Sequence, residues 1–198
     1  MTSSRSELPA SLAHLAVERT FDAGEAVFRM GASARHVHFL AEGRVTLSRF
    51  GPQGEEVAIH AARPGEFFAE ASLHSERYHC TAVVSQPALV ASIPSDELRA
   101  LLRRDPEFAM QWLAIVSRQL RQARTRVERL CLKGARERVR HLLLTEGSGA
   151  THRYAMPGTA KDLAIDLGLT HEALYRTLAS MEQEGLIVRD AGAIFLAN

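Results

Sequence analysis

The chain has 198 residues, of which 46% are hydrophobic and 24% charged, and its formal net charge is +1. These values are ordinary for one or two globular domains. The first residues, Met1 to Glu7, lack the apolar core of a signal peptide, and no run approaches the roughly 20 apolar residues of a membrane span. We therefore expect a cytoplasmic protein with no membrane partner.

The two cysteines, Cys80 and Cys131, lie far apart in the sequence. This spacing argues against a disulfide framework and against a four-cysteine zinc or iron–sulfur site within one chain. We interpret both as buried thiols.

Short apolar runs alternate with turn residues from about residue 20 to residue 95. The expected strands are 26–28, 37–40, 45–47, 57–59, 81–84 and 89–93. Glycines and prolines separate them, among them Gly43, Pro64-Gly65 and Pro87, at the close spacing typical of an antiparallel sandwich or barrel. We predict an N-terminal antiparallel β-roll that forms a sensor domain over residues 1–105.

Helical patterns follow the β-roll. Ser95 is expected to cap a short helix over 96–104, and Pro106 to open a long one. Apolar residues in the long helix recur every three or four residues, the period of a coiled coil. This seam comprises Leu113, Val116, Leu120, Ala123, Val127 and Leu130. A lone helix would expose the seam to water, so we predict homodimerisation along 106–132. Packing against the chain's own β domain is the alternative.

The segment from Thr159 to Leu178 predicts two short helices that meet at a tight turn. Gly168 provides the left-handed residue that such a turn needs, and Thr170 fits as the N-cap of the second helix. Two apolar runs joined around Asp190-Ala191-Gly192 predict a hairpin. We therefore predict a winged helix-turn-helix over residues 133–198, rather than an ordinary helical hairpin.

The second of these helices leaves polar side chains exposed near its start. They are His171, Glu172, Tyr175 and Arg176, the residues that a recognition helix inserts into a major groove. Residues 133–198 carry eight basic and eight acidic side chains and so have no net charge. DNA affinity must then come from the local placement of basic side chains, from helix N-termini and from the doubled number of contacts in a dimer. We expect Gly134 to act as the hinge before this domain.

A β-roll, a long helix and a winged helix in this order, with Gly65-Glu-Phe-Phe-Ala-Glu70, Arg138 and Thr170-His-Glu-Ala-Leu-Tyr-Arg176, resemble the Crp/Fnr family of bacterial transcription regulators. The resemblance covers nearly the whole chain. It implies an α+β fold and a homodimer that reads a palindromic operator in double-stranded DNA, with RNA polymerase as a further partner if the protein is an activator.

The resemblance also assigns roles within the winged domain. Glu172 and Arg176 match the family's main base-reading positions, and their chemistry suits G·C pairs. His171 stands where the cAMP receptor protein has an arginine, which leaves one base preference open. Thr159, Lys161 and Thr170 match positions that contact phosphates.

The effector pocket departs from the family pattern. Cyclic-nucleotide members have a glycine–glutamate pair followed at a fixed interval by arginine–serine, and here these read Ala69-Glu70 and Cys80-Thr81. On the long helix, the base-contacting threonine–serine pair reads Ala123-Arg124. A cyclic phosphate would lose its bidentate partner, so we expect a signal other than cAMP. Arg77 lies close by in sequence and is the candidate substitute.

Other sensing modes remain open to different degrees. An iron–sulfur cluster is not expected, because no cysteine precedes Cys80. A haem or metal site has weak candidates in His74, His79 and Cys80, and His36 and His38 share one face of a strand. Surface or hydrogen-bonded histidines are the default interpretation.

A second function class also fits the sequence. The alternative is a cyclic-nucleotide-like binding module whose C-terminal domain mediates protein contacts. We do not expect an enzyme, since the sequence has no Gly-rich phosphate loop, nucleophile elbow, paired catalytic carboxylates or HExxH motif.

Overall fold

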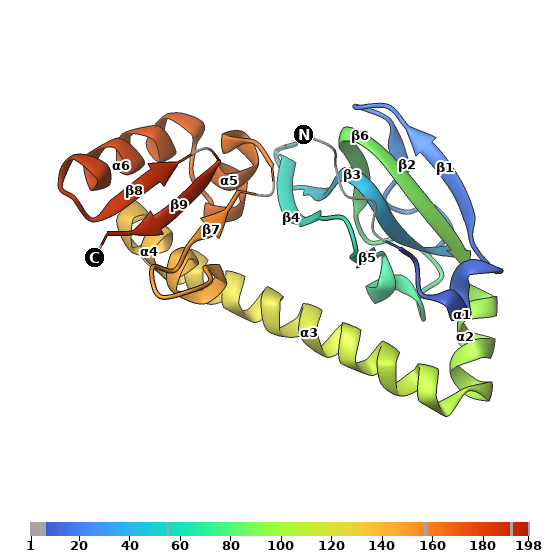
Figure 1. The fold of residues 1–198 in the computed structure, drawn as a ribbon. Helices are drawn as coiled ribbons and strands as arrows, with labels where there is room; N and C mark the ends of the chain where they lie inside the picture. The colour runs from blue at the N-terminus through green and yellow to red at the C-terminus, as the bar shows by residue number, and fades with distance from the viewer. Residues whose placement is uncertain (1–6, 55, 157, 191, 198) are drawn as a thin grey trace. The chain divides into compact units, whose positions relative to one another are not determined.

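The computed structural model describes residues 7–54, 56–156, 158–190 and 192–197 (Figure 1). The start of the chain and Ala191 of the predicted wing turn lie outside the described residues. Contacts divide the chain into two compact units, residues 1–117 and 118–198. The boundary falls inside the long helix α3 (Pro106–Cys131), so each unit contains part of this helix.

The first unit is built on an antiparallel sheet. Its elements are α1 (Ala10–Ala13), β1 (Val17–Phe21), β2 (Ala26–Phe28), β3 (His36–Phe50), β4 (Glu56–Ala62), β5 (Phe67–Phe68), the 3-10 helix η1 (Glu70–Ser72), β6 (Thr81–Pro94) and α2 (Ser95–Arg104). The strand order is β1-β6-β3-β4, with β2 paired to β6 and β5 paired to β3. The predicted antiparallel N-terminal sheet is confirmed.

The two long strands run through residues that the sequence analysis interprets as breaks. Gly43 lies inside β3 with φ 85°, and Pro87 lies inside β6. The β3–β6 register shifts around Gly43, and a Cβ built there would lie 2.1 Å from the Pro87 carbonyl oxygen. The prediction of separate strands on either side of Gly43 and Pro87 is therefore wrong, because a bulge takes up both residues.

Side chains that alternate along β3 enter two hydrophobic cores. Leu40 and Val45 belong to the core that also contains Phe68 and Val84. Val37, Phe39 and Ala41 belong to a second core, which α2 and the start of α3 complete. This period of two is the expected geometry of a strand buried on both faces.

The start of α2 differs from the prediction. Ser95 is the first residue of the helix and makes no capping hydrogen bond. Its buried hydroxyl instead donates to the Ala34 carbonyl oxygen at 3.2 Å. The capping role predicted for Ser95 is wrong, because this hydroxyl joins α2 to the segment before β3.

The second unit contains the end of α3 and a small helical domain with a sheet. Its elements are α4 (Ala135–Glu146), β7 (Tyr154–Ala155), α5 (Ala160–Leu167), α6 (His171–Gln183), β8 (Ile187–Asp190) and β9 (Ala193–Leu196). The sheet order is β7-β9-β8. The predicted helix-turn-helix and wing are confirmed, and two-residue β7 is an additional strand too short to give a periodic sequence signal.

The predicted seam lies largely exposed along α3. Leu113, Leu120 and Val127 are 54%, 52% and 61% exposed, whereas Phe108 and Trp112 on another face of the helix are buried in the second core. Val116, another seam residue, is partly buried and packs against the second core, so the β domain covers part of the seam.

Two further sequence expectations can be compared with the structure. Cys80 is buried but Cys131 is exposed, so the interpretation of Cys131 as a buried thiol is wrong. Cys131 ends α3 on a face that the winged domain does not cover. Among the described residues, no helix is long and apolar enough to span a bilayer.

Candidate nucleic-acid interface and effector pocket

The helix-turn-helix is fixed by capping interactions at both helix starts. The Thr159 hydroxyl accepts from the Asp162 amide at 3.2 Å, and the Asp162 carboxylate accepts from the Thr159 amide at 2.8 Å. Gly168 adopts φ 61° and ψ 41°, the left-handed conformation of the turn. The Thr170 hydroxyl then accepts from the Ala173 amide at 3.1 Å and caps α6. These bonds satisfy amides that a helix start otherwise leaves without partners.

Polar side chains occupy the exposed face of the first turns of α6. His171, Glu172, Tyr175 and Arg176 are all exposed, while Leu174 is fully buried beneath them. The His171 and Tyr175 rings meet edge to face, with centroids 4.6 Å apart. The structure thus brings together all the residues that the sequence analysis nominates for base reading.

Glu172 is held in its ionised form. Hydrogen bonds from its own backbone amide and from the Thr170 hydroxyl lower the pKa of its carboxyl group. An ionised carboxylate is a pure hydrogen-bond acceptor. Glu172 is therefore suited to an amino group on a base edge, and it would repel a phosphate.

The three nominated phosphate-contacting residues lie at the two helix starts. Lys161 is exposed in the first turn of α5. The Thr159 and Thr170 hydroxyls act as caps, and the Thr159 hydroxyl also donates to the Asp162 carboxylate at 2.9 Å. Their contribution to phosphate binding would accordingly come through the exposed backbone amides at helix N-termini, with Lys161 adding the charge.

Ion pairs elsewhere in the winged unit engage two of its arginines. Arg189 in the wing donates through Nε to the Glu182 carboxylate at 2.8 Å, and Arg136 of α4 binds Glu184 through both terminal nitrogens. These pairs lower the pKa values of both glutamates. The sequence analysis did not foresee them, since the partners lie seven and 48 residues apart.

The nominated effector residues Glu70 and Cys80 lie within the β-roll. Burial raises the pKa of both the Glu70 carboxyl group and the Cys80 thiol. Ala69, which replaces the family's glycine, keeps the left-handed backbone with φ 63°. The Thr81 hydroxyl accepts from the Met30 amide at 3.0 Å. Ala69 thus has a left-handed backbone, and a buried thiol stands where the family pattern has the phosphate-binding arginine.

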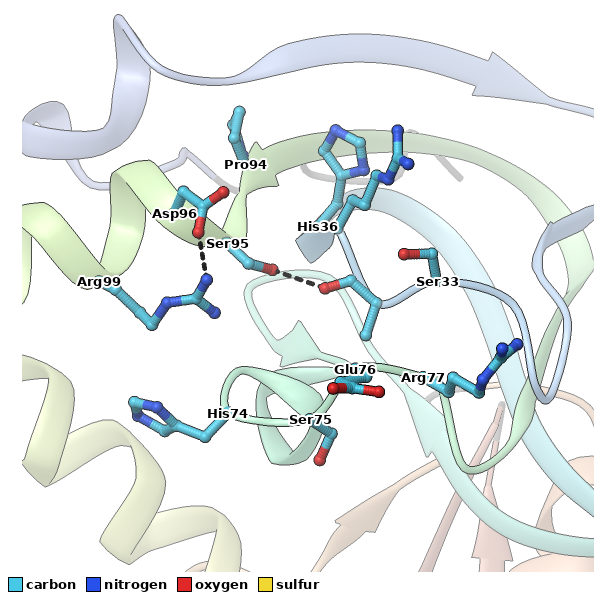
Figure 2. A pocket seen from close by; sticks show the side chains of 12 residues that line it. Ser33, His36, His74, Ser75, Glu76, Arg77, Pro94, Ser95, Asp96 and Arg99 are labelled. Carbon is cyan, nitrogen blue, oxygen red and sulfur yellow. Dashed lines mark hydrogen bonds and ion pairs between the residues drawn. The ribbon is translucent and has the colours of Figure 1, made fainter.

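Arg77 lies at a different place from Glu70 and Cys80. It donates to the Gly31 carbonyl oxygen at 2.7 Å and lines a cleft of about 1010 Å³. Figure 2 shows this cleft, with Arg77 and Arg99 reaching it from opposite sides. Neither Glu70 nor Cys80 lines it. The proposed substitution of the missing arginine by Arg77 therefore has no support from this geometry.

The cation that affects Cys80 is Arg49, which the sequence analysis did not nominate. Its positive charge lowers the Cys80 pKa against the larger effect of burial. Arg49 is exposed on β3, and its Nε donates to the His79 carbonyl oxygen at 2.7 Å. Strand pairing brings β3 beside β6, which sequence separation alone does not reveal. At the Cys80 position the pocket therefore offers a thiol with a raised pKa where the family pattern has an arginine.

The remaining effector nominees lie on α3. Ala123 and Arg124 are both exposed and belong to the second unit, whereas Glu70, Arg77, Cys80 and Thr81 belong to the first.

The histidines nominated for a metal have other neighbours. The His79 ring bonds the Ser72 hydroxyl at 2.9 Å, and His74 lines the cleft of Figure 2. His38 is buried beside the Phe28 and Phe68 rings and bonds Ser92. Among the described residues, no group of three or more histidine, cysteine, aspartate or glutamate side chains is arranged to hold a metal ion.

A β-roll, a long helix and a winged helix with an exposed polar α6 face are the architecture of a winged-helix transcription regulator. Residues 18–105 match the cyclic nucleotide-binding domain, and residues 137–198 match the Crp-like helix-turn-helix domain. The chain is 30% identical over 181 residues to the cyclic AMP receptor protein of Thermus thermophilus, covering 89% of this chain and 82% of that protein. The chain belongs to the Crp/Fnr family of transcription regulators, whose members bind DNA and act as dimers.

Other relatives agree with this assignment. The global nitrogen regulator of a Nostoc species is 29% identical over 83% of this chain and 73% of its own length. The solved structure of FixK2 from Bradyrhizobium japonicum shares the fold with a TM-score of 0.75 at 24% identity, covering 92% of this chain and 93% of that one.

Proposed function

We propose that this protein is a homodimeric regulator that binds a palindromic DNA site through α6 and responds to a signal other than cAMP. The observation that carries the proposal is the set of four exposed polar residues on the first turns of α6, above a buried apolar face. This arrangement is what major-groove recognition by a helix-turn-helix requires.

The exposed seam on α3 supports homodimerisation. Leu113, Leu120 and Val127 recur every seven residues, and each is more than half exposed in the single chain. Three such side chains on one helix face form an apolar stripe that a second copy of the helix would remove from water. Two-fold symmetry of the dimer then requires two recognition helices that face equivalent half-sites.

The chemistry of α6 indicates G·C pairs in each half-site. The Arg176 guanidinium can donate two parallel hydrogen bonds to O6 and N7 of one guanine, and the Glu172 carboxylate can accept from N4 of cytosine. The base that faces His171 is left open, because imidazole donates or accepts according to its tautomer.

Selection of binding sites from a random duplex library tests the DNA-reading proposal. We expect an inverted repeat with half-site centres roughly 34 Å apart, one helical turn. Binding should also weaken as salt rises, because phosphate contacts release counterions. A single asymmetric site would contradict dimeric reading. Absence of salt-dependent DNA binding would favour the alternative, a ligand-binding module whose C-terminal domain contacts protein.

The effector pocket supports a signal other than cAMP. The thiol of Cys80 stands where a phosphate-binding arginine is needed, and the pKa of the half-buried Glu70 carboxyl group is raised by desolvation. Calorimetry with cAMP should detect no micromolar binding, and millimolar cAMP should leave DNA affinity unchanged. An absorption spectrum and native mass spectrometry of the purified protein would reveal haem, metal or a retained small molecule.

A further inference from the structure

The C-terminal end of α5, the first helix of the helix-turn-helix, is capped by two arginines from other helices. Arg126 of α3 donates to the Ile165 carbonyl oxygen at 3.3 Å. Arg138 of α4 donates through Nη1 to the carbonyl oxygens of Leu167 at 3.1 Å and Gly168 at 3.0 Å. The last carbonyls of a helix have no partners within it and carry partial negative charge, so cations stabilise them.

Arg138 binds a second helix end at the same time. Its Nε donates at 2.9 Å to the carbonyl oxygen of Leu132, the residue directly after α3. One guanidinium therefore joins the end of α3 to the end of α5. Its planar fork holds several donors in fixed directions, so these bonds restrict the angle between the two helices as well as their distance.

Close packing at the turn reinforces this joint. A Cβ at Gly168 would lie 2.7 Å from Cδ2 of Leu130 and 3.2 Å from Nη1 of Arg138. Leu130 is also the last residue of the predicted dimer seam. Nearby, Arg129 is only 2% exposed and pairs with Glu146 at the end of α4. The turn before the recognition helix is thus packed directly against the last turn of α3.

We propose that Arg138 is a positioning residue that sets the direction of α6 relative to α3, and thereby the half-site spacing that the protein accepts. This inference rests on the proposed function, since spacing has meaning only for a dimer that holds two recognition helices. In such a dimer α3 fixes the symmetry axis, and the Arg138 joint transmits that axis to each α6. Arg138 need not touch DNA to act in this way.

The test is a panel of duplexes with identical half-sites and spacers altered by one or two base pairs in either direction. Each added base pair moves and rotates one half-site by about a tenth of a helical turn. The wild-type protein should prefer one spacer by about tenfold or more, which corresponds to about 1.4 kcal/mol. Arg138→Gln should reduce this preference to about twofold. The variant should keep its discrimination at the bases read by Arg176. General destabilisation of the protein would instead weaken the spacing preference and the base discrimination together.

Two further variants make the outcome decisive. Arg140→Gln is the matched control, because Arg140 is exposed on the same helix and carries the same charge, and it should keep the spacing preference. Arg138→Lys keeps the charge but offers one donor atom, so it should lose the preference even if Arg138→Gln fails to fold. A folded Arg138→Lys protein with the wild-type preference would overturn the inference. Absence of any spacing preference in the wild type would reject the proposed dimeric reading, and this inference with it.

Discussion

The two units of this protein differ in how closely their residues match the functional residues of the family. In the winged unit, the polar residues expected for DNA reading all lie exposed on the first turns of α6. In the β-roll, the sheet is present and Ala69 has a left-handed backbone, but Cys80 stands where the family pattern has the arginine for a cyclic phosphate. The fold of the β-roll depends on alternating apolar side chains, so its ligand chemistry can change without loss of the core.

The largest expected effect comes from disrupting the α3 seam. This change tests whether the seam holds the proposed homodimer together. The double variant Leu120→Glu and Val127→Glu would place like charges in a dry interface. We expect the dimer dissociation constant to rise by more than about a thousandfold, so that light scattering detects monomers. Gln122→Glu adds one such charge at an exposed position off the seam and should leave the dimer intact. A double variant that stays dimeric would place the interface elsewhere.

Removal of the Arg176 side chain tests the proposed base-reading role of α6 directly. Arg176→Ala should weaken binding to the cognate site by about 1–3 kcal/mol and flatten the preference at one base pair per half-site. Lys161→Ala is the contrasting variant, because loss of a phosphate contact should weaken all sequences alike and reduce the salt slope by about one per subunit. Equal weakening of all sequences by Arg176→Ala would reassign that arginine to the DNA backbone. Mobility-shift titrations at several salt concentrations measure both variants.

The stability of the β-roll should depend on pH through His38, which is not one of the nominated effector residues. Burial and the nearby His36 lower the pKa of His38 from 6.5 to about 3. The unfolded chain then binds more protons below pH 6.5, so stability falls as pH falls from 6.5 towards 3. Between pH 7.5 and pH 5 this histidine should remove about 2 kcal/mol from the free energy of unfolding.

Urea unfolding of His38→Phe is the measurement for this pH effect. Phenylalanine can keep the ring contacts that His38 makes with Phe28 and Phe68, and it cannot be protonated. The difference in the free energy of unfolding between wild type and variant should therefore change by about 2 kcal/mol between pH 7.5 and pH 5. A constant difference would mean that His38 titrates normally in the folded protein.

The smallest expected effect concerns the retained backbone of the altered pocket. Ala69→Gly should raise the free energy of unfolding by about 1 kcal/mol, because alanine is strained at a positive φ. Ala71→Gly, two residues along in η1, should instead lower it by about 0.5–1 kcal/mol. Thermal unfolding measures both. A lower free energy of unfolding for Ala69→Gly would show that burial of the Ala69 methyl group stabilises the protein by more than the backbone strain destabilises it.

The sequence predicts local features better than long-range ones. The turn at Gly168 and the Thr170 cap depend on neighbouring residues, and both were predicted correctly. The strand breaks at Gly43 and Pro87 were not, because only the pairing of β3 with β6 turns them into a bulge. The same limit applies to the effector pocket, where Arg77 is near Cys80 in sequence but Arg49 is the cation that affects its pKa.

The ion pairs of Arg136 and Arg189 also bear on how the protein finds its sites. Because Glu184 and Glu182 neutralise these two guanidinium groups, fewer cations remain to release counterions from random DNA. For the proposed DNA complex, we therefore expect weaker binding to random sequence and a smaller salt slope than eight free basic side chains per chain would give.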